Sequence, residues 1–537
     1  MGLASTQEYL CLHQYLSRNA VRFAGKMFIT HRDANIPYDE LNALSTSLAR
    51  FLKECGVRRG DRVALVLENS IEYVYSLLAI LRIGAIAVPM SDQHTVRSAL
   101  IHLRDFEPAA IILRQKTLET LWTAFDEIPS IRTVLIADGG FPSESRERAK
   151  SLSFDTSGRA GRRMVRLADV DKKSFLDEES PGPALSDNAM IIYTSGTTGS
   201  PKGVVLTHAN IVANAFSIIR YLGLTEADSV MVVLPFFYSY GNSLLTTHLI
   251  SGGTLVLENN FLYPNVVLEK MVEHGVTGFA GVPSTFSILL QRSNFRKLRF
   301  PRLRYVTQAG GAMPPRHAEE LRAVLPGTGI YIMYGQTEAT ARLTWLDPRD
   351  LTRKYGSIGK AIPGVTITLK KENGTEAGPG EVGEIVARGD NIMAGYWNNP
   401  VETKKVLRQD GLHTGDIARQ DDEGYLYIVG RRSDMIKSGA HRISPTEIEE
   451  AILEHPGVGE VAVIGIPDKT LGEAVQACIV PKGEAKLDVK EILVHCRLCL
   501  PAFKVPKRVV FVERLPKTSS GKVKRLELAD ILKGTTP

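Results

Sequence analysis

One stretch of the sequence, residues 193–203, is rich in groups that bind phosphate. It reads "YTSGTTGSPKG" and holds three glycines, five serine or threonine hydroxyls and one lysine. Glycines let backbone N–H groups turn toward an anion, hydroxyls donate further hydrogen bonds, and a lysine adds a compact positive charge. The Walker pattern is not met, because two residues separate Gly199 from Lys202. The stretch therefore predicts a polyphosphate-binding loop unlike that of GTPases.

Size and composition limit the class of protein. The 537 residues exceed what one core usually supports, so we expect two or more folded units. The 44% hydrophobic and 23% charged residues are typical of soluble globular proteins, and a net charge of +6 spread along the chain does not indicate a nucleic-acid partner. No segment has the roughly 18 apolar residues of a membrane span, and no secretory signal opens the chain. We therefore expect no stable membrane insertion and a cytoplasmic location.

The five cysteines are few and odd in number, which favours reduced thiols over a disulfide framework. Cys496 and Cys499 form a C-x-x-C pair. A zinc site would need two more cysteine or histidine ligands nearby, and a redox motif would need a thioredoxin-like context. Neither is evident, so the pair is expected to occupy ordinary helix positions.

Short β-branched runs alternate with segments of helical period through most of the chain. The runs "AAIILR", "TVLIA", "MIIYTSG", "SVMVVLP" and "TLVLE" predict strands, whereas 207–221 and 314–325 predict helices. Residues 138–187 are poorer in apolar periodicity and predict a surface connection. The alternation indicates an α/β fold with largely buried sheets.

The pattern changes in the last third of the chain. Residues 355–430 contain glycine-bounded alternating runs that predict antiparallel hairpins, and a compact α+β tail follows. Ser444 is expected to cap the first helix of the tail in a capping box with Glu447. We predict a body over 1–430 made of α/β subdomains and a β-rich subdomain, a hinge over 431–434, and a small mobile lid over 435–537.

The long stretch "YTSGTTGSPKGVVLTH" resembles the signature loop of the AMP-forming acyl- and aryl-CoA synthetases, a superfamily that includes nonribosomal-peptide adenylation domains and firefly luciferase. Further motifs of that family occur in the same order: "YGQTEAT", "GSIGKAIPG", "GEIVARGDNIMAGYW", "HTGDIA", "GRRSDMIKSGAHRISPTEIE" and "LPKTSSGKVKR". The resemblance covers nearly the whole chain from about residue 30. It implies that a carboxylate and ATP form acyl-AMP and pyrophosphate, after which a thiol attacks to give a thioester and AMP.

The resemblance also implies roles for matching residues. The β- and γ-phosphates of ATP would be held by Thr194, Ser195, Gly196, Thr197, Thr198 and Lys202. The rest of the nucleotide would be held by Gly310, Gly311, Ala312, Tyr334, Gly335, Gln336, Asp416 and Arg431, with Tyr334 on adenine and Asp416 on the ribose hydroxyls. Thr337 would contact the α-phosphate, and Glu338 would help to hold Mg²⁺, a cation that prefers oxygen ligands.

The tail is expected to work as a lid that rotates between the two steps. The resemblance implies that Lys522 enters the site for the first step, and that Lys437 and Gly439 face it after rotation. The family commonly has Asp or Lys where this hinge has Ser433, and a second glycine where the thiol tunnel has Ala440. The hinge and the form of the thiol acceptor are therefore open points.

Residues after the predicted strand at 229–235 bear on the acid that is activated. Tyr238 matches a position that gates the carboxylate pocket, and Ser239 stands where amino-acid-activating relatives have an aspartate. The small residues Gly310, Gly311 and Ala312 leave room at the pocket floor. These features favour a medium-chain fatty acid or an aryl acid over an α-amino acid.

The sequence leaves open which of two thiols accepts the acyl group. Coenzyme A is the first expectation and an acyl carrier protein is the alternative. Residues 497–525 contain nine lysines or arginines against one acid, which is either a solvated face or a surface for an anionic acceptor. A catalytically silent scaffold is a third hypothesis, and the presence of Lys202, Glu338, Asp416 and Lys522 argues against it.

Overall fold

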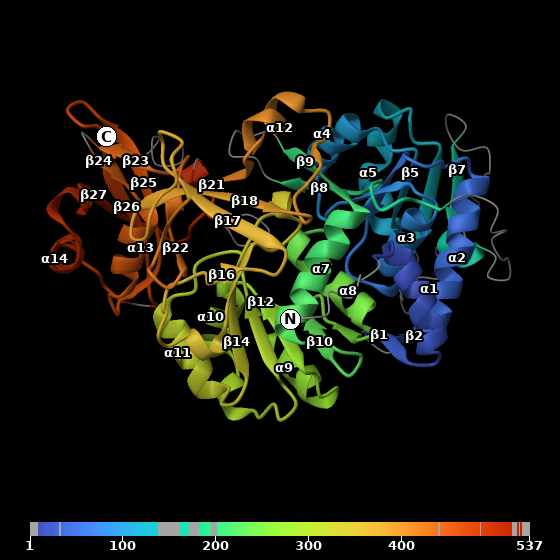
Figure 1. The fold of residues 1–537 in the computed structure, drawn as a ribbon, viewed down its shortest axis with the longest axis horizontal. Helices are drawn as coiled ribbons and strands as arrows, with labels where there is room; N and C mark the ends of the chain where they lie inside the picture. The colour runs from blue at the N-terminus through green and yellow to red at the C-terminus, as the bar shows by residue number, and fades with distance from the viewer. Residues whose placement is uncertain are drawn as a thin grey trace, which may run out of the picture.

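A computed structural model provides the structure of the chain. It describes residues 9–31, 34–137, 162–170, 182–194, 201–438, 441–483, 485–517, 523–525 and 527–528. These residues form a mixed α/β fold in which the body and the lid each have their own sheets (Figure 1). The fold class expected from the sequence is confirmed. No helix within the described ranges is long and apolar enough to cross a membrane.

The first sheet of the body carries the stem of the predicted phosphate loop. Its strand order is β19-β9-β8-β4-β3-β5-β6-β7. The strands are β3 (Arg62–Val66), β4 (Ile86–Pro89), β5 (Ala110–Arg114), β6 (Thr133–Ala137), β7 (Arg163–Arg166), β8 (Asn188–Thr194), β9 (Lys202–Thr207) and β19 (Gly395–Tyr396). The strands from β3 to β8 pair in parallel, whereas β8 and β9 form an antiparallel hairpin. The predicted loop therefore joins two neighbouring strands. The strand β7 also lies within the predicted surface connection, which the sequence pattern had not indicated.

The second sheet has the order β16-β15-β14-β13-β12-β10-β11-β1-β2. Its strands are β1 (Met27–His31), β2 (Ala34–Pro37), β10 (Ser229–Val232), β11 (Thr254–Leu257), β12 (Gly278–Gly281), β13 (Tyr305–Gln308), β14 (Gly329–Tyr334), β15 (Thr344–Leu346) and β16 (Lys360–Ala361). The strands β10 to β14 pair in parallel and are mostly buried, as expected from their β-branched and apolar runs.

Helices of the body pack on these two sheets (Figure 1). They are α1 (Leu12–Arg22), α2 (Tyr38–Glu54), α3 (Ile71–Arg82), α4 (Val96–Phe106), α5 (Gln115–Leu121), α7 (His208–Leu222), α8 (Ser239–Ser251), α9 (Pro264–Glu273), α10 (Pro283–Arg292), α11 (Pro315–Val324) and α12 (Pro400–Val406). The helix α7 begins at a capping box between Thr207 and Asn210 and ends at Gly223, which has a positive φ of 60°. The predicted helices over 207–221 and 314–325 are confirmed as α7 and α11.

An antiparallel sheet forms the β-rich part of the body. Its strands are β17 (Val365–Lys370), β18 (Val382–Gly389), β20 (Leu407–Arg408), β21 (Gly411–Gln420) and β22 (Leu426–Arg431). Neighbouring strands pair antiparallel throughout. The hairpins expected between residues 355 and 430 are therefore confirmed.

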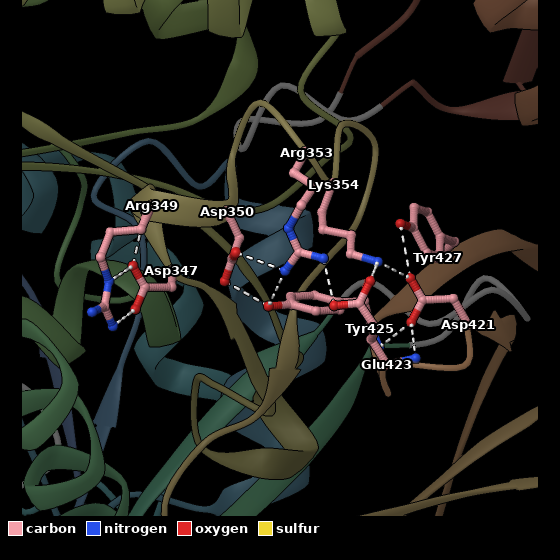
Figure 2. A network of polar contacts seen from close by, with 9 residues as sticks. All are labelled: Asp347, Arg349, Asp350, Arg353, Lys354, Asp421, Glu423, Tyr425 and Tyr427. Atoms are coloured by element: carbon pink, nitrogen blue, oxygen red, sulfur yellow. Dashed lines mark hydrogen bonds and ion pairs between the residues drawn. The ribbon is translucent and has the colours of Figure 1, made fainter.

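A network of charged groups joins this sheet to the second sheet (Figure 2). Lys354 follows β15, is only 8% exposed, and donates to Asp421 and Glu423 in the turn between β21 and β22, at 2.7 Å to each carboxylate. The hydroxyl of Tyr425 donates to Asp350 at 2.5 Å. The polar contacts hold two loops together that are about seventy residues apart in sequence.

The lid follows as a small unit with its own core (Figure 1). It contains β23 (Ile436–Ser438), β24 (His441–Ile443), α13 (Pro445–Leu453), β25 (Val458–Asp468), β26 (Gly472–Pro481), α14 (Val489–Cys499) and β27 (Arg508–Phe511). The last body strand, β22, and the first lid strand, β23, belong to different sheets. The predicted hinge lies between them.

The structure corrects the predicted capping box at the start of α13. Ser444 occupies the N-cap, but its side chain makes no capping hydrogen bond. Its hydroxyl instead donates to the backbone carbonyl of Val429 in β22, and Glu447 pairs with Lys504. The prediction was wrong because both side chains find partners in other elements. Ser444 thereby ties the lid to the last strand of the body.

Charge pairing also changes the interpretation of the basic stretch over 497–525. Several of its residues pair with acids from elsewhere in the lid or hinge: Lys504 with Glu447, Lys507 with Asp468, Lys517 with Glu460, Lys524 with Glu527, and Arg525 with Glu449 and Asp434. Arg497, Arg508 and Arg514 make no ion pair with the residues that the structure describes. Much of the apparent positive charge is therefore neutralised locally.

Candidate active site

The predicted pocket and nucleotide motifs lie at one edge of the second sheet. Because β10, β12, β13 and β14 are parallel, the segments that follow them emerge at the same edge. Open α/β sheets bind ligands at this carboxyl edge. The segments are 234–239 after β10, 282–283 after β12, 309–312 after β13 and 335–338 after β14. The topology therefore brings together motifs that are spread over about a hundred residues.

Lys202 connects the phosphate loop to this edge. It begins β9, and its ammonium nitrogen lies 2.6 Å from Oε2 of Glu402 at the start of α12. The same nitrogen lies 5.3 Å from the ring centre of Tyr396, whose hydroxyl donates to Oε1 of Glu338 at 2.8 Å. One aromatic ring thus lies between the predicted phosphate lysine and the predicted magnesium ligand.

The ionisation of these groups follows from their contacts. Hydrogen bonds from Lys202 and Lys405 lower the pKa of Glu402 to about 2, so this carboxylate is ionised at neutral pH. Burial and the nearby charge of Glu338 raise the pKa of the Tyr396 hydroxyl, which therefore stays protonated and remains a donor. The site accordingly presents fixed charges of both signs around one tyrosine.

A second cluster matches the predicted adenosine contacts. The hydroxyl of Tyr334, at the end of β14, donates to Oδ2 of Asp416 in β21 at 2.6 Å. Arg431, at the end of β22, lies 3.3 Å from Oδ1 of the same carboxylate. Burial and the charge of Asp416 raise the pKa of Tyr334 well above its usual value. The cluster joins the second sheet to the β-rich sheet next to the hinge.

The predicted acid pocket adjoins Thr337. Tyr238 precedes α8 and Ser239 begins it, and the Ser239 hydroxyl lies 3.3 Å from that of Thr337. The ring of Tyr238 packs on Phe237 at 4.4 Å between centres. The residue expected to contact the α-phosphate is therefore adjacent to the segment expected to contact the acid.

The predicted pocket floor follows β13. Gly310 has a φ of +88°, a conformation that glycine adopts readily, and a Cβ there would lie 3.2 Å from Val282. Gly311 is held by a hydrogen bond from the Gln308 side chain to its carbonyl at 2.8 Å. Gly310, Gly311 and Ala312 are exposed in the structure, so this segment is open on one side.

Of the other predicted lid and hinge residues, the structure describes Lys437 and Ser433, and both make contacts within the lid or the hinge. Lys437 lies exposed in β23, and its backbone N–H donates to Glu473 of the lid at 2.6 Å. Ser433 is exposed in the predicted hinge and bonds to Asp434 at 2.8 Å. The remaining predicted residues lie outside the described residues: Ser195, Gly196, Thr197, Thr198, Gly439, Ala440 and Lys522. Thr194 is described, at the end of β8.

Two residues of the site were not assigned by the sequence analysis. Tyr396 and Glu402 contact Lys202 directly, although they are nearly two hundred residues away in sequence. The quoted motif "GEIVARGDNIMAGYW" includes Tyr396, but its pattern shows no reason to connect it with the phosphate loop. The pairing of β19 with β9 places it there.

Glu338 is suited to hold a magnesium ion. It is half-buried, and a carboxylate is a hard oxygen ligand of the kind that Mg²⁺ prefers. One oxygen accepts from Tyr396, and the backbone carbonyl of Glu338 accepts from Met393 at 2.9 Å, so the residue is held in place. The donor present fits the predicted ion.

Known proteins share this sequence and fold. The model of the AMP-binding enzyme family matches residues 16–397, and that of the AMP-binding enzyme C-terminal domain matches residues 447–522. The long-chain-fatty-acid–CoA ligase of Salmonella typhimurium is 33% identical over 98% of this chain and 95% of that protein. The feruloyl-CoA synthase of an Amycolatopsis species is 32% identical over 93% of this chain and 94% of that protein. The O-succinylbenzoate coenzyme A synthetase of Bacillus subtilis, in complex with ATP and magnesium ion, has a TM-score of 0.80 at 29% identity, covering 96% of this chain and 98% of that one.

The two-part fold and the nucleotide-type site define an adenylate-forming enzyme. The chain belongs to the AMP-binding enzyme family, in the group of AMP-forming acyl- and aryl-CoA synthetases. It is therefore an acid–thiol ligase, and the predicted co-substrates ATP and coenzyme A and the predicted ion Mg²⁺ fit this class.

Proposed function

We propose that this ligase activates a medium-chain fatty acid or an aryl acid as acyl-AMP and transfers the acyl group to coenzyme A. The observation that supports the proposal most is the convergence of two clusters at one site. Lys202, Tyr396 and Glu338 form the first, and Tyr334 and Asp416 belong to the second. Together they offer contacts for phosphates, a metal ion and a ribose.

In the first step, a carboxylate oxygen of the acid attacks the α-phosphorus of ATP, and the bond to the pyrophosphate oxygen breaks. Lys202 would bind the departing phosphates, and Thr337 would donate to the α-phosphate. Mg²⁺ held by Glu338 would neutralise phosphate charge. Catalysis would come mainly from alignment and charge stabilisation, because the chain has little covalent chemistry to perform.

In the second step, the thiol of coenzyme A attacks the acyl carbon, the thiol proton is released, and AMP leaves. The lid would present Lys522 in the first step, then rotate about 431–434 so that Lys437 and Gly439 face the site. Lys437 is exposed on β23 and makes its described contact within the lid, which leaves its ammonium available after a rotation. The separate sheets on either side of the hinge support such a movement.

The proposed acid class rests on the segment around Ser239. A serine there contacts Thr337 and supplies no carboxylate for an α-amino group. The relatives named above take their names from a long-chain fatty acid, a feruloyl group and O-succinylbenzoate, each of which has a fatty or an aryl part. A medium-chain or aryl acid is the class that we would test first.

Carboxylate-dependent pyrophosphate release tests the proposal. Purified enzyme is assayed with ATP, Mg²⁺ and a panel of fatty acids of increasing length, aryl acids and amino acids, with and without coenzyme A. We expect turnover with one fatty or aryl class, stimulated by coenzyme A. Acyl-AMP that accumulates regardless of coenzyme A would contradict the proposed acceptor and favour an acyl carrier protein. Turnover with amino acids alone would contradict the proposed acid.

A further inference from the structure

The outer side of the lid brings three potential metal ligands together. Glu454, His495 and Cys499 each offer one donor atom, and these atoms lie within 4.8 Å of one another. His495 and Cys499 are four residues apart on α14, so they lie on one face of that helix. Glu454 follows α13 directly as its C-cap. The three groups therefore connect two helices of the lid.

The spacing is close to that of a zinc site. Sγ of Cys499 lies 4.0 Å from Nε2 of His495. Zinc bonds of about 2.3 Å to sulfur and 2.0 Å to nitrogen place tetrahedral ligands about 3.5 Å apart. Glu454 and Cys499 are exposed, so small side-chain rotations can close the remaining gap. A thiolate, an imidazole and a carboxylate together suit zinc, whereas a thiolate is too soft for Mg²⁺.

The surroundings hold the histidine in place. Nε2 of His495 lies 2.8 Å from the backbone carbonyl oxygen of Ala451. The same Nε2 is the nitrogen that lies 4.0 Å from the thiol sulfur, so a zinc ion bound there would take the place of this hydrogen bond. The ring also packs edge-on against His455, 5.3 Å between centres. The Ala451 carbonyl lies in the last turn of α13, where the helix dipole favours a cation.

The C-x-x-C pair does not supply both thiols. Cys496 is fully buried in the core of the lid, and burial raises the pKa of its thiol to about 11. Cys499, three residues further along α14, is exposed. The potential metal ligands next to Cys499 are His495 and Glu454.

We propose that Glu454, His495 and Cys499 bind one zinc ion, with water in the fourth position. The thiol of Cys499 loses its proton on binding, so the affinity rises with pH. The helix α14 lies on the side of the lid that faces away from the body (Figure 1). An ion there would brace α13 against α14 and stabilise the lid.

Cobalt substitution tests the site in the full-length, metal-free protein. We expect Co²⁺ to produce thiolate-to-metal charge-transfer absorption that saturates at one equivalent and is removed by Zn²⁺. Cys499→Ser should lose this absorption and bind Zn²⁺ at least about 100-fold more weakly. Cys55→Ser changes a half-buried cysteine in the body, and this variant should keep the Co²⁺ absorption and the Zn²⁺ affinity of the wild type.

The thiolate absorption separates this site from a magnesium site at Glu338, which offers no thiol. The proposal is overturned if wild type shows no such absorption, or if Cys499→Ser retains it. Glu454→Gln provides a second variant with an exposed, conservative change, and it should weaken Zn²⁺ binding while leaving the melting temperature of the metal-free protein unchanged. An unchanged Zn²⁺ affinity in that variant would remove Glu454 from the site.

Discussion

At the scale of single residues, Lys202 is held by a carboxylate. Its ammonium is bound to Glu402 at 2.6 Å, beside the ring of Tyr396. A lysine side chain loses conformational entropy when it is held in one position. The contact with Glu402 already restricts the Lys202 side chain in this way. The arrangement fixes a positive charge at the end of the predicted phosphate loop.

We expect Lys202→Ala to lower kcat/KM for ATP about 10- to 100-fold, because a hydrogen bond between charged groups contributes about 1.5–3 kcal/mol. Initial rates at varied ATP concentration measure the effect. Lys405→Ala is the matched control, since Lys405 contacts the same Glu402 but is exposed and belongs to α12. If kcat/KM for ATP fell equally in both variants, the loss would come from a disturbed Glu402 and the role of Lys202 would be contradicted.

At the scale of elements, the network of Figure 2 joins the loop after β15 to the turn between β21 and β22. Lys354 is enclosed and bonds to two carboxylates, whereas Arg349 in the same figure is 89% exposed and bonds to Asp347. Removing the Lys354 cation takes away the ion-pair partner of Asp421, while Glu423 keeps Arg353. An exposed pair such as Arg349 and Asp347 contributes little.

Lys354→Met should therefore lower the melting temperature by a few degrees. Arg349→Met should leave it nearly unchanged, because solvent already screens that pair. Differential scanning calorimetry on the two variants makes the comparison. A similar melting temperature for both would show that the network does not stabilise the junction.

A further prediction at this scale concerns the lid. Lys522→Ala should reduce acyl-AMP formation by at least about 100-fold, the size expected for loss of one group that stabilises transition-state charge. Thioester formation from supplied acyl-AMP should persist. Gly439→Leu should give the reverse pattern, because a side chain would obstruct the proposed thiol path. Each half-reaction is measured separately, and equal loss of both steps in either variant would contradict the two-position lid.

At the scale of the whole molecule, buried histidines make stability depend on pH. Burial lowers the pKa of His13 to about 3 and the pKa of both His208 and His248 to about 4. The unfolded chain binds protons at these residues near pH 6.5, while the folded protein does not. Stability is therefore lost as pH falls from about 6.5 toward 4, by up to about 1.4 kcal/mol per pH unit for each histidine.

We expect urea unfolding to show a falling free energy of unfolding between pH 7 and pH 5. His208→Gln should show a shallower dependence, because glutamine does not titrate. His274→Gln is the control, since His274 is exposed at the end of α9. A pH dependence identical in all three proteins would exclude His208 as a contributor.

Much of the fold was predictable because its signals are local. Apolar runs indicated β5, β6, β10 and β11, and helical periodicity indicated α7 and α11. The capping box at Ser444 failed because its hydroxyl binds Val429, a contact between two units that local sequence does not specify. The ion pairs of the basic stretch 497–525 could not be predicted either, since its partner acids lie elsewhere in the lid or in the hinge.

By itself, the sequence determined the family and the residue types available for chemistry, because motifs that resemble those of the family occur in the same order along nearly the whole chain. Only the tertiary structure decided which side chains meet. The pairing of β19 with β9 places Tyr396 near Lys202, and the hairpin of β21 and β22 places Arg431 beside Asp416. Likewise, the packing of α13 on α14 brings Glu454 to His495. Such contacts depend on strand order and helix packing, which arise from burial of the whole chain and are not encoded in any single stretch.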